Sequence, residues 1–221
     1  TAAGSSSSSS SSVASVWVRG PDMCHARCGL GASVHFGGSS DGGSDLLYAV
    51  GGYGGGSTYH NSAEVLDLGG DPSRLEWRAI APMKFKRTGC GVAVGADGCC
   101  YAVGGSPDGS QAHKSAERFD PREGRWRPLP SMVLGRGYCS AAFALSGSLV
   151  VSGGMNNEGQ ELQSVEVLDC RMLKEWHTTT KFHRRHCEGD ADGDDGQSNA
   201  NPVAGGRLEA EEEEEKEASG V

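Results

Sequence analysis

The sequence lacks any run of about 18 apolar residues, the length that a helix needs to cross a lipid bilayer. We therefore expect neither a membrane-spanning helix nor a membrane partner. Hydrophobic residues are also scarce, at 36% of the 221 residues against the roughly 45–50% usual in globular domains. Because the shortfall lies mostly at the two ends of the chain, length and composition predict one domain of ordinary size with polar ends.

Basic residues are few as well, with 20 Lys and Arg against 29 Asp and Glu. The imbalance belongs to residues 188–221, which hold 12 of the acidic residues and only 2 of the basic ones. No stretch shows the clustered Lys and Arg of a nucleic-acid footprint, so we predict no nucleic-acid partner. The composition of residues 188–221 is typical of a solvated, disordered tail. A sharper hypothesis is that this tail folds back onto an arginine-bearing face and competes there with acidic ligands.

The N-terminal end is equally biased in composition. Residues 1–12 are low in complexity and finish with eight consecutive serines at positions 5–12. Serine tracts bury too little apolar area to offset the entropy of the chain, which predicts a disordered segment. The predicted folded part is therefore residues 13–187.

The eight cysteines show no clear disulfide framework. Cys99 and Cys100 are adjacent in a predicted strand, where successive side chains point to opposite faces. Cys90 and Cys139 occupy the same position in a repeat described below, as small interior residues do. Four disulfides are the alternative. We expect reduced thiols and an intracellular protein, in the cytoplasm or alternatively in the nucleus.

Signals for a metal, a cofactor or catalysis are weak. The spacings Cys24-His25-x-x-Cys28 and His183-x-x-His186-Cys187 lack the second half of a zinc site. The glycine run at residues 51–56 precedes no predicted helix, which argues against a nucleotide-binding loop. The sequence contains no G-x-S-x-G element. We predict no metal, no cofactor and no enzymatic activity.

A repeat of about 50 residues dominates residues 13–187. Three glycine doublets mark it, the second lying 53 residues after the first and 49 before the third. A Glu follows each doublet by twelve residues, an Asp follows that Glu by three, and a Trp comes later at a variable distance. The repeated residues are Gly51, Gly52, Gly104, Gly105, Gly153 and Gly154, then Glu64, Glu117 and Glu166, then Asp67, Asp120 and Asp169, then Trp77, Trp126 and Trp176. A period of this length is typical of propellers and solenoids.

A second pattern joins one repeat to the next. In two copies a Met comes six residues after the Trp, an Arg four after that Met, and a Cys three later. These copies are Met83, Arg87 and Cys90, and Met132, Arg136 and Cys139. Trp17, Met23 and Arg27 keep the first two spacings, so the end of an earlier repeat precedes the first complete one. We expect residues 13–19 to be its outermost strand.

The repeats share one order of residues: aromatic-Ala-Val-Gly-Gly, then Ala-Glu-x-Φ-Asp, then Trp, then Met-x-x-x-Arg. This order resembles the kelch repeat. The likeness is to the version found in kelch-like substrate adaptors of cullin-RING ubiquitin ligases, over about residues 13–176. It implies an all-β fold, a partial kelch β-propeller with three complete four-stranded antiparallel blades plus remnant strands. The expected blades are residues 28–80, 89–127 and 138–177, after the remnant at 13–19 and before a fourth unit that begins near His183 and fails.

Three blades are fewer than a ring needs, because closed propellers use about four to eight. We therefore expect a fragment of a longer gene product or a chain that completes itself by association. The sequence contains neither the BTB domain of the adaptor family nor an F-box. Contact with a cullin-RING ligase would accordingly depend on domains outside this chain.

The resemblance also implies a binding face. In kelch-like adaptors the loop between one blade's last strand and the next blade's first lies on the substrate face. An Arg in this loop commonly contacts acidic groups of a bound peptide, since its donor fork suits carboxylates. Arg27, Arg87 and Arg136 are thus candidate partner-binding residues, for a protein or peptide ligand of acidic character. The equally weighted alternative is that each Arg pairs with the Glu of its own repeat and fixes the blade geometry.

Four more candidates lie in or beside variable loops. The ten-residue loops after the doublets are residues 53–62, 106–115 and 155–164. They differ in sequence while their frames repeat, as binding loops on a rigid scaffold do. By resemblance Tyr53 and Tyr138 match positions that often line the adaptor pocket, and His60 matches His113 by register. The alternative for each is an ordinary solvated loop residue.

These features predict a non-catalytic protein-binding module that presents loops on one face. Substrate recognition for a cullin-RING ligase is the role that the resemblance implies, and an actin-associated kelch scaffold is the alternative. A fragment of an enzyme like galactose oxidase is disfavoured, because we cannot place its copper ligands or its Tyr–Cys crosslink. The repeated Glu and Asp occur once per repeat, which indicates a structural signature rather than paired catalytic carboxylates.

Overall fold

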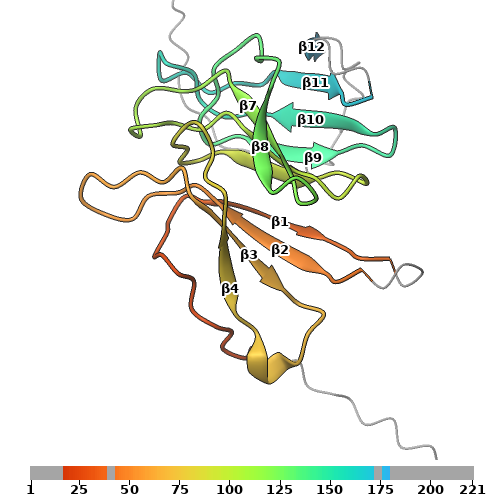
Figure 1. Ribbon diagram of the computed structural model, residues 1–221. Coiled ribbons are helices and arrows are strands. Elements are labelled where there is room, and N and C mark those ends of the chain that lie inside the picture. Colours follow the sequence, from red (N-terminus) through yellow and green to blue (C-terminus); the bar gives the residue numbers. More distant parts are fainter. Residues whose placement is uncertain (1–16, 39–42, 172–175, 180–221) are drawn as a thin grey trace, which may run out of the picture. The chain divides into compact units, whose positions relative to one another are not determined.

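The structure is a computed structural model, and it describes residues 17–38, 43–171 and 176–179. Within these residues twelve β-strands form three four-stranded antiparallel sheets, each made of strands consecutive in sequence (Figure 1). We call the sheets blades 1, 2 and 3. The predicted all-β partial propeller is confirmed. In the described part of the chain, no helix is long and apolar enough to cross a membrane.

The strands of each blade follow the predicted order. Blade 1 comprises β1 (Gly31–His35), β2 (Leu46–Val50), β3 (Ala63–Asp67) and β4 (Trp77–Ile80). Blade 2 comprises β5 (Gly91–Val94), β6 (Cys100–Val103), β7 (Ala116–Asp120) and β8 (Arg125–Leu129). Blade 3 comprises β9 (Ser140–Phe143), β10 (Ser148–Ser152), β11 (Val165–Asp169) and β12 (Trp176–Thr179). The first strands lie side by side, β1 beside β5 and β5 beside β9, so these three are the inner strands.

Strand β6 shows how the sequence produces this packing. All four of its residues are buried, because a blade lies on each of its faces. Tyr101 and Val103 join the apolar cluster shared with blade 3, whereas Cys100 and Ala102 join the one shared with blade 1. Cys99 belongs to the blade 3 cluster, so the adjacent cysteines face opposite ways, as the period of two requires.

The glycine doublets are explained by close approach of the next blade. Gly51 and Gly104 have φ of 67° and 63°, in the left-handed region that glycine adopts at little cost. A Cβ at Gly51 would lie 2.1 Å from the carbonyl oxygen of Arg87, and one at Gly104 would lie 2.4 Å from that of Arg136. The first two doublets therefore let the backbone of the following repeat pass where a side chain would collide.

Two of the repeated tryptophans connect blades 2 and 3 to the segment before each. The indole Nε1 of Trp126 donates to the carbonyl of Ala81 at 2.7 Å, and that of Trp176 donates to the carbonyl of Pro130 at 2.8 Å. Trp17 makes no such contact among the described residues, and it is 101% exposed.

The predicted strand at residues 13–19 is wrong where it can be checked. Residues 17–19 have no strand structure, and residues 13–16 lie outside the described part. A strand is stabilised by its ladder of hydrogen bonds, and no described strand lies beside this segment to supply one. The predictions for residues 1–12, for His183 and the failed fourth unit, and for residues 188–221 also lie outside the described residues.

Candidate functional site

Each blade carries at one end an arginine enclosed by its own repeat. Nη2 of Arg87 donates to Oε1 of Glu117 at 2.9 Å, and its Nη1 donates to the carbonyls of Gly104 and Ser115 at 2.6 and 2.9 Å. The same set recurs in blades 1 and 3, where the Arg27–Glu64 and Arg136–Glu166 pairs measure 2.6 and 3.1 Å. The guanidinium therefore holds the glycine doublet, the loop after it and the third strand together.

The glutamate partners also fix the segments that carry the arginines. We call these segments the Met–Arg linkers, residues 23–30, 83–90 and 132–139. Oε2 of Glu117 accepts the N–H of Lys84 at 2.8 Å, and Oε2 of Glu166 accepts the N–H of Val133 at 2.7 Å. Oε2 of Glu64 accepts the N–H of Cys24 at 2.8 Å. Each carboxylate thus anchors the linker that enters its blade.

This geometry decides between the two hypotheses for the arginines. The side chains of Arg27, Arg87 and Arg136 are 0% exposed, so they cannot contact a ligand in this conformation. Their assignment as partner-binding residues is corrected here, and the Arg–Glu alternative holds. The arginines are buried because the buried carboxylates of Glu64, Glu117 and Glu166 need an opposite charge and hydrogen bonds, which the arginines supply.

Glu64 shows the electrostatic consequence directly. Burial opposes ionisation of its carboxyl group, but hydrogen bonds from Arg27, His25 and the Cys24 N–H outweigh burial and lower the pKa of Glu64. The carboxylate is therefore charged at neutral pH. It serves as a structural counter-ion and has no proton to exchange with a substrate.

The linkers meet at the inner edge of the same end of the blades. The N–H of Gly89 donates to the carbonyl of Gly29 at 2.7 Å, and the N–H of Tyr138 donates to that of Gly89 at 2.7 Å. The three residues are equivalent by register and share positive φ, 59° at Gly29, 63° at Gly89 and 56° at Tyr138. Tyr138 is the one non-glycine residue of the described part with positive φ.

Tyr138 therefore occupies a glycine position with a large side chain that is 61% exposed. A non-glycine residue in the left-handed region costs about 1–3 kcal/mol, and such strain clusters at functional sites. The strain together with the exposure favours the predicted partner-binding role of Tyr138 over that of a solvated loop residue.

The doublet loops, residues 53–62, 106–115 and 155–164, border the linkers. Tyr53 pairs by a β-bridge with Cys28 and with Tyr59, whose ring centroid lies 5.0 Å from its own. Met155, at the equivalent position of blade 3, bridges to Gly137 and is 39% exposed. Sequence reasoning missed Tyr59 and Met155 as candidates, although the position of Met155 directly after its doublet matched that of Tyr53.

The structure places His60 and His113 at equivalent positions behind the loop surface. The N–H of each donates to the carbonyl of the second doublet glycine, at 2.9 Å in His60 and 2.8 Å in His113. Their Nε2 atoms are buried, and the backbone of Ala26 lies beside His60 as that of Lys86 lies beside His113. Burial, followed by the charge of Arg27 or Arg87, lowers the pKa of both rings, so both are neutral at pH 7.

Neighbouring loops touch and form one continuous surface. A Cβ at Gly109 would lie 2.9 Å from the hydroxyl of Tyr59, which comes from the preceding doublet loop. The N–H of Ala112 donates to the amide oxygen of Asn157, which belongs to the following loop. We call the surface made by the Met–Arg linkers and the doublet loops the loop face. The loop face is built from all three blades.

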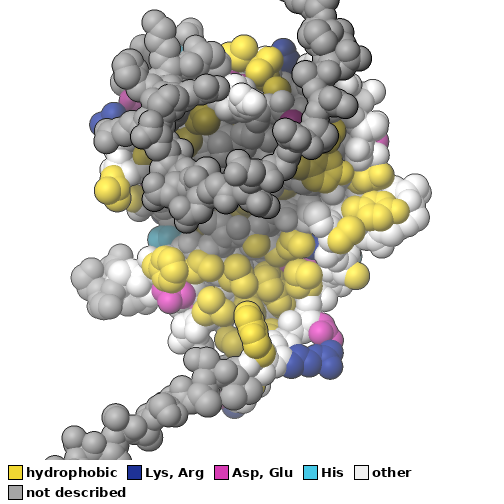
Figure 2. All heavy atoms as spheres, turned by 180° about the vertical axis from the view of Figure 1, so that it is seen from behind, with side chains coloured by type: hydrophobic (Ala, Val, Ile, Leu, Met, Phe, Trp, Pro, Cys, Tyr) yellow, Lys and Arg dark blue, Asp and Glu magenta, His cyan; other side chains and the backbone are white. Residues whose placement is uncertain are grey.

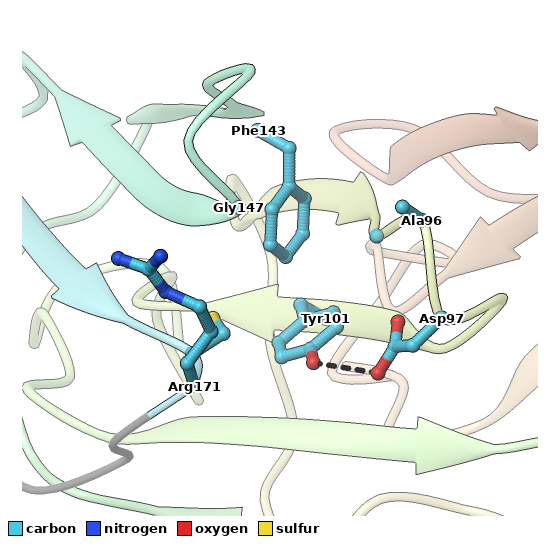
Figure 3. Close-up of a pocket in the computed structure, with 8 residues that line it drawn as sticks. Ala96, Asp97, Tyr101, Phe143, Gly147 and Arg171 are labelled. Atoms are coloured by element: carbon cyan, nitrogen blue, oxygen red, sulfur yellow. Dashed lines mark hydrogen bonds between the residues drawn. The ribbon is translucent and has the colours of Figure 1, made fainter.

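A small pocket lies at the other end of the blades, between blades 2 and 3, with a volume of about 200 Å³ (Figure 3). Tyr101 and Phe143 line it, with ring centroids 4.9 Å apart in an edge-on arrangement. The Tyr101 hydroxyl donates to Oδ2 of Asp97 at 3.1 Å, and Nη2 of Arg118 lies 3.0 Å from the same oxygen. The carboxylate is thus engaged by the protein itself, which indicates a structural role.

No group of three or more His, Cys, Asp and Glu in the described residues is arranged to hold a metal ion. The seven described cysteines are free thiols, and Cys90, Cys99, Cys100 and Cys139 are buried. Burial raises the pKa of Cys90 to about 11 and that of Cys99 to about 12, so these thiols stay protonated at neutral pH.

Comparison with known proteins agrees with this architecture. The family model described as "Kelch motif" matches residues 43–84, 86–133 and 136–181. "Kelch-like protein 23" from Pongo abelii is 42% identical over 52 residues, which are 23% of this chain and 9% of that protein. "Kelch-like ECH-associated protein 1B" from Danio rerio is 40% identical over 90 residues, 41% of this chain and 14% of that protein. The matches thus span a small part of these curated relatives.

Solved structures share the fold at low identity. "Structure of YjhT" aligns with a TM-score of 0.57 and 14% identity, over 73% of this chain and 48% of that one. "Novel fungal alcohol oxidase with catalytic diversity among the AA5 family, in complex with copper" aligns with a TM-score of 0.50 and 21% identity, over 59% of this chain and 28% of that one. Identities this low show the fold alone.

Proposed function

Because the chain belongs to the kelch-repeat family, we propose that its blades act as a non-catalytic module that binds a protein or peptide through the loop face. One observation carries this proposal. The blades repeat their buried Arg–Glu frame, while the side chains exposed beside that frame differ from repeat to repeat. A constant frame with variable, accessible side chains is what a recognition surface needs.

We propose that aromatic side chains, and not the three buried arginines, contact the ligand. Tyr138 combines a strained backbone with an exposed side chain. The ring of Tyr53 lies beside the ring of Tyr59 on the loop face. Tyrosine supplies a large contact area with few rotatable bonds, so it loses little entropy when it binds. His60 and His113 stay in the proposal as residues that support the loops from behind.

The prediction that the ligand is acidic has less support than the loop face itself. It was implied by exposed arginines, and the three arginines are buried. Lys84 and Lys86 remain as exposed cations on the second Met–Arg linker. An acidic peptide would therefore be bound through these lysines at the rim, with a salt-dependent contribution.

Peptide selection tests the proposal without a known partner. The immobilised chain is panned against a random peptide library on phage, and selected peptides are measured by fluorescence anisotropy. Tyr138→Gly and Tyr53→Ala are each expected to weaken binding about tenfold, the equivalent of about 1.4 kcal/mol. Leu145→Glu is the control, because Leu145 is fully exposed in the β9–β10 turn at the far end of blade 3. Equal binding by wild type and both tyrosine variants would place the site elsewhere.

A finer proposal is substrate recognition for a cullin-RING ligase in the cytoplasm. It rests on the resemblance to kelch-like adaptors, and both relatives carry the name Kelch-like. The competing role is an actin-associated scaffold. Sedimentation of the chain with filamentous actin separates them, since an adaptor module stays in the supernatant. Co-sedimentation that saturates with filament concentration would favour the scaffold.

A further inference from the structure

A pocket of about 440 Å³ lies beside the second Met–Arg linker, at the loop-face end of blade 2. Residues 82–85 line it from the linker, and the start of β7 and the end of β8 line it from the sheet, where Ala116 pairs with Leu129. We call it the outer pocket, because β8 is the outermost strand of its blade (Figure 1). Its lining residues all lie in the described part of the chain, and its volume falls in the range of about 300–1,000 Å³ that ligand sites occupy.

The floor of the outer pocket is apolar and rigid. Trp126 and Pro128 project from the same face of β8, because side chains alternate along a strand. Trp126 packs on the apolar cluster shared with blade 1, and its indole N–H donates to the carbonyl of Ala81 at 2.7 Å. These contacts fix the indole ring before a ligand binds, so a ligand side chain that enters here needs to order few groups of the protein.

The linker adds a cation beside an aromatic ring. Nζ of Lys84 lies 5.2 Å from the centroid of the Phe85 ring, and that ring lies 5.3 Å from the ring of His113 in the doublet loop. Phe85 is partly buried by this packing, whereas Lys84 is exposed. The linker therefore places a positive charge at the mouth of an apolar pocket.

The acidic residue of the lining does not cancel this charge. Oε1 of Glu117 accepts from Nη2 of Arg87 at 2.9 Å, and its Oε2 accepts the N–H of Lys84 at 2.8 Å. The Glu117 carboxylate is thus balanced by the Arg87 guanidinium inside the blade. Lys84, Glu117 and Arg87 together carry one net positive charge, which the exposed Lys84 ammonium presents at the pocket.

Two hydroxyl groups add further donors. Oγ of Ser115 accepts from Nη2 of Arg87 at 2.9 Å, so its own O–H can still donate to a ligand. Ser131 lines the pocket from the segment after β8, where it is exposed. A ligand with carboxylate or carbonyl oxygens therefore matches the polar groups of the pocket, and a cationic ligand does not.

The walls of the outer pocket are specific to blade 2. By register, Lys84, Phe85 and Pro128 are replaced by Cys24, His25 and Ala79 in blade 1 and by Val133, Leu134 and Thr178 in blade 3. Both of those blades form the same four-stranded sheet without this set of residues. The packing of a blade therefore does not require the set, which leaves recognition of a ligand as its role.

We propose that the outer pocket binds an acidic segment of a partner protein, with a large apolar side chain against Trp126 and a neighbouring Asp or Glu carboxylate paired with Lys84. Charge complementarity selects this occupant, because one cation and two hydroxyl groups surround an apolar floor. An apolar anchor in a pocket with a polar rim is a usual arrangement at the centre of a protein interface. Figure 2 shows hydrophobic side chains over the blade 1 sheet as well, but the outer pocket differs in joining its apolar floor to a cation, which defines the chemistry of the ligand.

This inference rests on the proposed function for the class of partner, and it adds a second contact to it. His113 and Ser115 belong to the doublet loop at residues 106–115, so the outer pocket continues the loop face outward. Tyr138 lies on the third Met–Arg linker, at the inner edge of the blades. A peptide that reaches both would be held at two separate points, which can be tested one at a time.

The test uses an array of short synthetic peptides, each with one Leu, Phe or Trp flanked by Asp or Glu, and matched peptides with Asn or Gln instead. At low salt the labelled chain is expected to prefer the acidic peptides about fivefold, the upper range for one exposed ion pair. Lys84→Glu should abolish this preference. Lys86→Glu is the matched control, because Lys86 is exposed on the same linker but does not line the pocket, and the preference should remain. No preference in the wild type, or an equal loss in both variants, would overturn the proposal.

Occupancy of the pocket is measured by ¹⁹F NMR of the chain labelled with 5-fluorotryptophan. The strongest acidic peptide of the array should shift the resonance of Trp126, which Trp126→Phe identifies. The resonance of Trp176, at the equivalent position of blade 3 and 6% exposed, should stay in place. A Trp126 resonance that does not move at saturating peptide would overturn the proposal, even where the array shows binding.

Tyr138→Gly separates this inference from the proposed function. Binding that Lys84→Glu weakens and Tyr138→Gly does not would support the outer pocket and count against the proposed contact of Tyr138. Binding that Tyr138→Gly weakens and Lys84→Glu does not would overturn the outer pocket and leave the loop face standing. Binding that both substitutions weaken would support one peptide held at both points.

Discussion

The Arg–Glu pair is the residue-scale unit from which each blade is built. In blade 2 the Arg87 guanidinium binds two carbonyls and the Glu117 carboxylate, while that carboxylate caps the N–H of Lys84. Arginine suits this position because its planar fork makes several bonds from fixed directions, which a lysine ammonium cannot do. The pair therefore sets the angle at which the linker leaves one blade and enters the next.

Arg87→Met is expected to destabilise the chain by about 3–5 kcal/mol, because it leaves the Glu117 carboxylate buried without its counter-ion. That is a large part of the roughly 5–15 kcal/mol by which domains are stable. Urea unfolding followed by tryptophan fluorescence measures the change. Arg87→Met combined with Glu117→Gln should recover part of the loss. Arg122→Met is the control, since Arg122 is itself exposed and its partner Asp120 keeps an ion pair with Arg118, so the midpoint should change little.

Stability should also fall as the pH drops below about 6.5, the ordinary pKa of histidine. Burial and then the charges of Arg27 and Arg87 lower the pKa of His60 and His113 in the folded chain. The unfolded chain then binds more protons, so stability is full above the unfolded pKa and is lost as the pH falls toward the folded one. Urea midpoints between pH 7.5 and 5.5 measure this slope. The His60→Gln/His113→Gln double variant should flatten it, and an unchanged slope would contradict the argument.

The sequence located these residues but could not assign all of their roles. The register of Arg27, Arg87 and Arg136 was clear from the spacing, yet burial depends on which face of the loop the chain turns inward. The spacing is the same for an arginine that faces solvent and for one that faces Glu117. The strain at Tyr138 could not be predicted either. Gly29 and Gly89 stand at the equivalent positions, but only the backbone angles show that these positions require a positive φ.

At the scale of elements, the blades were the most predictable feature. Each strand combines short apolar runs with a period of two, and each turn carries Gly, Asp or Pro, so composition and periodicity agree. The strand predicted at residues 13–19 failed because a strand is not a local property. Residues 17–19 keep the register of Trp77 and Trp126, but no strand of the described part lies beside them to pair with.

Gly104→Ala probes the contact between two elements. Its Cβ would lie 2.4 Å from the Arg136 carbonyl oxygen, so the linker must move in addition to the cost of positive φ. Gly147→Ala is the matched control, with φ of 82° and no atom within 4 Å of the new Cβ. Thermal unfolding should show a loss of about 1 kcal/mol for the control, the ordinary cost of a left-handed alanine. Gly104→Ala should lose clearly more, and equal losses would show that this contact yields easily.

At the scale of the whole molecule, the coverage of the outer blades sets part of the stability. Among the described residues no further sheet packs on the outer faces of blades 1 and 3, and burying apolar surface yields about 25 cal/mol per Å². Any segment or partner that covers these faces in the folded protein therefore adds to its stability.

Ala142→Glu should therefore lower the melting temperature more than Leu145→Glu does. Ala93, the equivalent of Ala142 in blade 2, is 4% exposed against the neighbouring blade, whereas Leu145 is fully exposed in the β9–β10 turn. Differential scanning calorimetry of the two variants makes this comparison. Equal melting temperatures would mean that the outer face of blade 3 stays in contact with water in the folded protein.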